Sequence, residues 1–183
     1  MADYCKAFTR KIINPVSPDE SYMLKLYPGY TTIAHVNPKI RTNLLNQIAK
    51  AAKNADFNTY YYDAFGAFRY RTDKSVNQLI FDINKQINDA KYQNKPLCIM
   101  LDRPDIGLTL PELRKLRNHI AGICRNIHVK ADCSADWPIY IIAATDNFEL
   151  AQNLCLNPEN GNTTVFGNYR DFVSKLMPPE NED

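Results

Sequence analysis

Apolar positions along the chain form short unbroken runs and longer segments with helical spacing, a pattern that predicts strands alternating with helices. The runs at 31–34, 96–101 and 137–144 are typical of buried strands in a parallel sheet. Between them, leucine, isoleucine and alanine recur every three or four residues at 44–52 and 113–127, which predicts amphipathic helices. We therefore expect a mostly parallel sheet that is covered by helices on both faces.

Weaker patterns predict the remaining elements. Two alternating runs, at 4–13 and 22–26, are separated by a turn that contains two prolines, so we expect a small antiparallel strand pair at the N-terminus. Further along, we expect an aromatic strand at 58–62, an irregular stretch at 63–71 and helices at 75–90, 147–154 and 168–176. A short closing strand is expected at 163–166. The sequence thus predicts the α/β class, with ligand sites at the carboxyl ends of the parallel strands.

Length and composition favour one domain. With 183 residues, 45% of them hydrophobic, the chain has enough apolar material for a full core, and we expect a single domain at 1–177 followed by an acidic disordered tail at 178–183. Its five cysteines are widely spaced without a C-x-x-C pair, which argues against a zinc site and favours a reducing compartment. A net charge of +2 does not indicate any particular class of binding partner. Because no segment is apolar enough for a signal or a membrane span, we expect a cytoplasmic protein without a membrane partner.

The strand ends carry the motifs that point to a family. Residues 35–42, HVNPKIRT, stand where a Walker A loop has G-P-N-G-S-G-K-T, and they retain Asn37 and Thr42. Residues 98–108, CIMLDRPDIGL, are similar to the Walker B and D-loop run h-h-h-h-D-E-P-D-I-G-L. In this order the motifs resemble those of a P-loop NTPase, and more narrowly an ABC-type ATPase head, the group that includes SMC-like and DNA-repair heads.

This resemblance implies a set of nucleotide-binding positions. Thr42 and Asp102 would hold Mg²⁺, and Ser75 falls in the segment KSVNQ, where the family has its L-S-G-G-Q signature. For Asp102 a structural role as a turn carboxylate stays open, and for Ser75 a role as a helix N-cap. The tentative nucleotide-binding set is Asn37, Lys39, Arg41, Thr42, Ser75 and Asp102.

Four departures from the family pattern argue against ATP hydrolysis. The glycine positions that frame the loop hold His35 and Ile40, and a β-branched residue suits neither positive φ nor close approach of the backbone to phosphate. Arg103 replaces the glutamate that polarises the attacking water, and Asp146 replaces the switch histidine. Losing such groups slows phosphoryl transfer by orders of magnitude. We expect Arg103 and Asp146, at adjacent strand ends, to pair with each other.

Cations among aromatic residues form a second candidate region. Arg114, Lys115 and Arg117 belong to one predicted helix, while Arg69 and Arg71 stand among phenylalanine and tyrosine. Such groups hold nucleic acid by phosphate contact and base stacking, although a solvated helix face has the same composition.

Three functional hypotheses follow from the sequence. The first is a degenerate ABC-type ATPase-like protein, catalytically impaired and without a cofactor, that acts by binding a macromolecular partner such as another ATPase or a second copy of itself. The second is an atypical ATP-binding protein or NTPase that uses ATP and Mg²⁺ through Arg41, Thr42 and Asp102. The third is a nucleic-acid-binding accessory factor.

Overall fold

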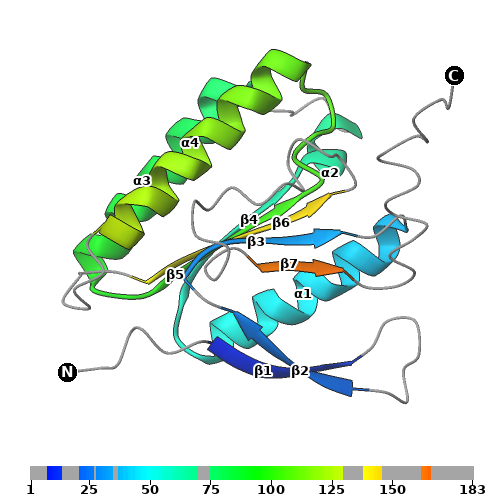
Figure 1. Cartoon of the computed structure of the whole chain (residues 1–183), viewed down its shortest axis with the longest axis vertical. Coiled ribbons are helices and arrows are strands. Elements are labelled where there is room, and N and C mark those ends of the chain that lie inside the picture. Colours follow the sequence, from blue (N-terminus) through cyan, green and yellow to red (C-terminus); the bar gives the residue numbers. More distant parts are fainter. Residues whose placement is uncertain are drawn as a thin grey trace, which may run out of the picture.

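The fold is seen in a computed structural model of the chain, shown in Figure 1. The structure describes residues 8–13, 21–26, 28–34, 37–69, 75–129, 138–145 and 162–165, and it describes side chains at 26, 28–33, 37–67, 75–124 and 138–145. The predicted helices at 147–154 and 168–176 and the predicted tail at 178–183 lie outside the described residues.

A parallel sheet forms the centre of the molecule and confirms the predicted α/β class. Its strand order is β4-β5-β6-β3-β7, and every neighbouring pair is parallel. Every position of the adjacent strands β5 and β6 is buried, which explains why their sequences are apolar up to the last residue of each strand. The strands are β3 (Gly29–Ala34), β4 (Asn58–Asp63), β5 (Leu97–Asp102), β6 (Ile139–Thr145) and β7 (Asn162–Val165).

Helices cover the two faces of this sheet. Helix α1 (Pro38–Asn54) lies on one face, and α3 (Val76–Gln93) and α4 (Leu110–Val129) lie side by side on the other (Figure 1). Each face has its own apolar cluster, one around Leu44 and Met100 and the other around Ile83 and Ile99. Successive side chains of β5 point to opposite faces of the sheet, so this strand contributes to both apolar clusters.

The N-terminal segments form a separate two-stranded sheet. Strand β1 (Phe8–Ile13) pairs antiparallel with β2 (Ser21–Leu26), with Phe8 opposite Leu26. In Figure 1 this pair lies on the side of α1 that faces away from α3 and α4.

Local residues explain where the helices begin and end. Asn37 caps α1 with its side chain and Pro38 occupies the first turn, where its missing N–H costs nothing. Ser75 caps α3, and Asn94 ends that helix in the left-handed conformation, with φ of 54°.

Two boundaries differ from the sequence expectation. A short helix, α2 (Ala64–Arg69), occupies most of the stretch expected to be irregular, and the Asp63 side chain accepts a hydrogen bond from the Gly66 N–H in its first turn. Helix α1 begins at Pro38, within the segment that the Walker A alignment treats as loop.

Candidate functional site

The carboxyl ends of the central strands meet in one region. Helix α1 leaves β3 toward one face of the sheet, whereas α3 and α4, which follow β4 and β5, cover the other face. Such a change of face is where open α/β sheets place their ligand sites. It brings the first turns of α1 close to the end of β5, although β6 separates β3 from β5 within the sheet.

Asp102, the last residue of β5, is the centre of this region. The residue has no exposed surface, and its Oδ2 accepts hydrogen bonds from the Thr42 hydroxyl at 2.7 Å and from the Tyr61 hydroxyl at 3.1 Å. The structure therefore brings together Thr42 and Asp102, the two residues that the family resemblance assigns to Mg²⁺. Among the described residues, Asp102 Oδ1 has no hydrogen-bond partner.

The Asp102 carboxylate also affects the pKa of Tyr61. Burial of the phenol raises the pKa of Tyr61 well above its ordinary value, and the nearby Asp102 charge raises it further. Tyr61 therefore stays protonated and serves Asp102 as a hydrogen-bond donor.

Arg103 supplies a positive charge at the same point. Its Nε lies 3.4 Å from Asp102 Oδ1, and its Nη2 lies 3.6 Å from Asp63 Oδ1, so the guanidinium stands between two carboxylates. The group also lies over the Phe65 ring, with 4.3 Å from Cζ to the ring centroid. Among the described residues, Arg103 pairs with Asp102 and Asp63, while the predicted partner Asp146 lies outside the described residues.

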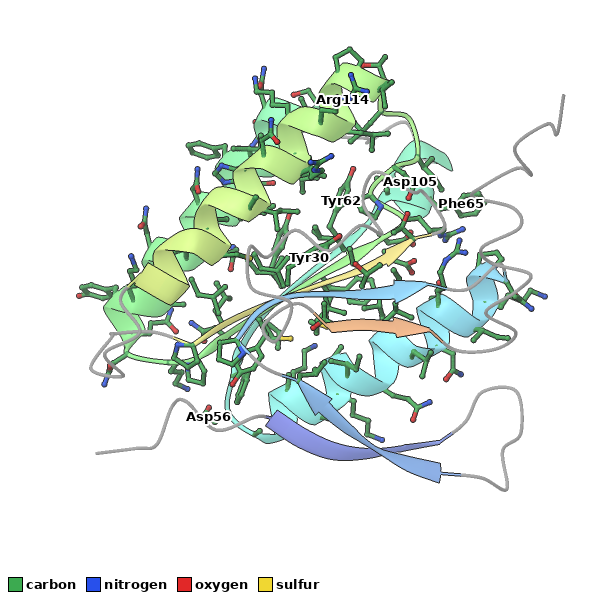
Figure 2. The ribbon with its side chains drawn as sticks, in the orientation of Figure 1. Tyr30, Asp56, Tyr62, Phe65, Asp105 and Arg114 are labelled. Atoms are coloured by element: carbon green, nitrogen blue, oxygen red, sulfur yellow. The ribbon has the colours of Figure 1, made fainter. Side chains whose placement is uncertain are left out.

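The backbone of Arg103 is held in an unusual conformation. Its φ is 51°, in the left-handed region that side-chain-bearing residues rarely adopt, and its N–H donates to the Ala144 carbonyl at 2.8 Å. Beside it, the Thr145 hydroxyl donates to Asp105 Oδ1 at 2.8 Å. These two contacts fasten the turn after β5 to the end of β6. Phe65 and Asp105 are labelled close to this end of the sheet in Figure 2.

The beginning of α1 differs from a phosphate-binding loop. Lys39 N–H is bonded to Asn37 Oδ1 at 3.0 Å, and Arg41 N–H bonds to the Asn37 carbonyl at 3.4 Å. Pro38 has no N–H to offer, and Ile40 lies within the helix, where its β-branched side chain is tolerated. Within 37–42, the chain's own groups therefore use backbone donors that a glycine loop turns toward phosphate.

The side chains of this segment also diverge in exposure. Asn37 and Lys39 are exposed at the end of the helix, whereas Arg41 is buried, with 3% of its surface accessible. The structure thus places Arg41 inside the fold and Lys39 outside it. His35 lies outside the described residues.

The other predicted positions are dispersed. Ser75 Oγ accepts the Gln78 N–H at 3.2 Å, which is the N-cap arrangement. Arg114 and Lys115 are exposed on α4, and Arg117 is half-buried on the same helix. Arg69 ends α2, but its side chain is not among those described, and Arg71 lies outside the described residues.

Sequence reasoning missed Tyr61, Asp63 and Phe65 as parts of this site. A signal for Asp63 was present, because it ends β4 as Asp102 ends β5, and in register the two residues are direct neighbours. Parallel strands of equal length place such terminal carboxylates side by side. Tyr61 and Phe65 gave no equivalent signal, since aromatic residues in a strand and the next turn are ordinary core material.

The described residues contain no group of three or more histidine, cysteine, aspartate or glutamate side chains arranged to hold a metal ion. Within the same part of the chain, no helix combines the length and the apolar character needed to cross a membrane.

The comparisons with known proteins add no family to this geometry. The chain matches no protein-family model and no curated protein sequence.

Proposed function

We propose that this chain is a degenerate ABC-type ATPase-like protein that has lost ATP hydrolysis and acts by binding a macromolecular partner. The observation that carries the proposal is the position of Arg103, whose guanidinium lies 3.4 Å from the buried Asp102 carboxylate. In the family that the motifs resemble, this carboxylate serves a metal ion and the following residue is an acid. Here the following residue brings the positive charge itself.

The donor set of the site supports this reading. Thr42 and Asp102 offer the oxygen ligands that Mg²⁺ prefers, but the guanidinium is close to the same carboxylate and repels a second cation. Asp63, the carboxylate that ends the neighbouring strand β4, is also paired with Arg103. The residues present therefore fit a resident magnesium ion poorly while Arg103 keeps this position.

The start of α1 supports the same conclusion. A helix that begins at Pro38 and is capped by Asn37 has replaced the part of the loop in which glycines would expose backbone N–H groups to phosphates. The groups that usually bind the nucleotide and those that hydrolyse it are both replaced. We therefore assign the function of the domain to its surface, which would bind the partner.

ATP hydrolysis by the purified protein tests the proposal. We expect the release of phosphate from ATP and Mg²⁺ to match a no-protein control, and we expect the same for Asp102→Asn, a nearly isosteric variant whose fold is checked by circular dichroism. Turnover by the wild type that disappears in Asp102→Asn would overturn the proposal.

One observation favours a second candidate, an atypical ATP-binding protein that uses Mg²⁺. Asp102 Oδ1 is buried without a hydrogen-bond partner among the described residues, and the Thr42 hydroxyl stands on the other oxygen of the same carboxylate. If Arg103 turns away, these groups present a cation site. Manganese-induced line broadening at Thr42 in the presence of ATP supports this candidate, and equal broadening in Asp102→Asn counts against it.

A further inference from the structure

Helices α3 and α4 share an outer surface that the site above does not use. Their buried residues, such as Leu79, Ile83 and Ile120, pack against the sheet, so positions half a turn away face outward. Lys115 Nζ donates to Asn77 Oδ1 at 2.6 Å, and His119 Nε2 lies 3.1 Å from Asn84 Oδ1, so the two helices are joined along one seam. We call the exposed residues Phe81, Lys85, Asn88 and Tyr92 of α3, with Arg114 and Lys115 of α4, the outer face.

Two aromatic side chains on the outer face are exposed. Phe81 has 62% and Tyr92 has 93% of its surface accessible, whereas a large aromatic ring is normally placed where it buries area. Eleven residues separate them, about three turns of helix, so they project on the same side about 16 Å apart. Lys85 and Asn88 lie between them on that side. The rings are therefore isolated platforms and do not merge into one apolar patch.

Three of the six residues of the outer face are cations. Lys85, Arg114 and Lys115 are exposed, the amide that Lys115 contacts leaves its charge in place, and Arg114 makes an interaction within the chain. Among the acidic residues of the two helices, Asp82 accepts hydrogen bonds from Gln78 and Tyr60, and Glu112 accepts from the backbone and hydroxyl of Thr109 at the start of α4. Asp89 is exposed four residues after Lys85 and three before Tyr92, so by helical spacing one acidic side chain lies beside these two residues at the edge of the outer face.

We propose that the outer face binds single-stranded nucleic acid, with bases stacked on Phe81 and Tyr92 and phosphates held by Lys85, Arg114 and Lys115. This rests on the proposed function, because it names the class of macromolecular partner. Separated aromatic rings interleaved with cations and amides are the composition of a single-strand platform. A protein partner is the weaker match, since the core of a protein interface is contiguous, apolar and depleted of lysine.

Fluorescence anisotropy with a labelled oligothymidine of about 20 nucleotides, and with the matching oligouridine, tests the inference at low and moderate salt. Loss of one stacking platform in Phe81→Ala or Tyr92→Ala is expected to weaken binding about 5- to 150-fold, while Phe81→Trp keeps it. Lys85→Gln and Lys115→Gln are each expected to reduce the slope of log affinity against log salt by about 0.7. The control is Lys50→Gln, a matched removal of one charge at an exposed position of α1 on the opposite face of the sheet.

Each contrary outcome has a distinct meaning. No binding by the wild-type protein at low salt overturns the inference, and it leaves the proposed function to its own ATP hydrolysis test. Binding that the α1 variant weakens as much as the outer-face variants places the site elsewhere and also overturns the inference. Equal affinity for a duplex of the same length contradicts single-strand stacking.

Discussion

Replacing Arg103 tests whether its positive charge stabilises the buried Asp102 carboxylate. In Arg103→Ala the charge of Asp102 loses the cation 3.4 Å away, while the hydrogen bonds from Thr42 and Tyr61 remain. In Arg103→Gly the same cation is lost, but the backbone at φ of 51° is no longer strained. Comparing the two variants separates the electrostatic role of the residue from its conformational cost.

The structure sets the expected size of these effects. Breaking a buried ion pair costs about 3–5 kcal/mol, and we expect the lower end because Arg103 is partly accessible and Asp102 keeps two donors, so Arg103→Ala should lower the free energy of unfolding by about 3 kcal/mol. Relief of the left-handed conformation offsets about 1 kcal/mol, so Arg103→Gly should lower it by about 2 kcal/mol.

Urea unfolding followed by circular dichroism measures both variants, alone and in the Asp102→Asn background. If Arg103 compensates the Asp102 charge, Arg103→Ala should cost at least about 1 kcal/mol less when Asp102 is already neutral. An equal cost in both backgrounds would refute the compensation of the Asp102 charge and leave the ion pair with Asp63 and the packing against Phe65.

The same variants test whether Mg²⁺ can bind Asp102 once the Arg103 guanidinium is removed. In Arg103→Gly, Mg²⁺ at about 10 mM should restore about 1.4 kcal/mol if the freed carboxylate binds it with a dissociation constant of about 1 mM. The wild-type protein should gain nothing from Mg²⁺. Equal stabilisation of both proteins would show that Arg103 does not exclude a metal ion.

Three further predictions concern single groups. Tyr61→Phe removes a donor to the Asp102 carboxylate and should cost about 1.5–3 kcal/mol in urea unfolding, and a neutral result would show that the 3.1 Å contact contributes nothing. Ser75→Ala should cost about 1 kcal/mol as the loss of an N-cap, with Ser75→Asp retaining most of the stability, and failure of aspartate to substitute would argue for another role. Burial lowers the pKa of His119, so the unfolded chain binds a proton at higher pH than the folded chain, and the free energy of unfolding should fall as pH drops below about 6.5. His119→Gln, which keeps a donor for Asn84, should remove that dependence, and an unchanged pH profile would contradict the assignment.

The parallel sheet was predictable because its determinants are local. The runs at β5 and β6 are apolar up to the last residue of each strand, as strands covered on both faces require, and the helical spacing of Leu79, Ile83 and Ile87 marks α3. The contact of Thr42 with Asp102 also follows from chain order, because the ends of parallel strands and the helix that follows them share one edge.

The details of the site were less predictable because they depend on strand register and on competition between neighbours. Arg103 has carboxylates on both sides, and only the pairing of β4 with β5 shows that Asp63 is within reach. The start of α1 at Pro38 reflects the Asn37 cap, which the alignment with a phosphate loop obscured. The exposure of Phe81 and Tyr92 depends on which side of α3 meets the sheet, and composition does not contain this information.

We propose that Arg103 and the capped start of α1 leave the chain without a dependable nucleotide site. Isothermal titration calorimetry with ATP and Mg²⁺ at millimolar ligand tests it most directly. We predict no heat of binding for the wild-type protein. A saturable heat that is lost in Asp102→Asn would contradict the account.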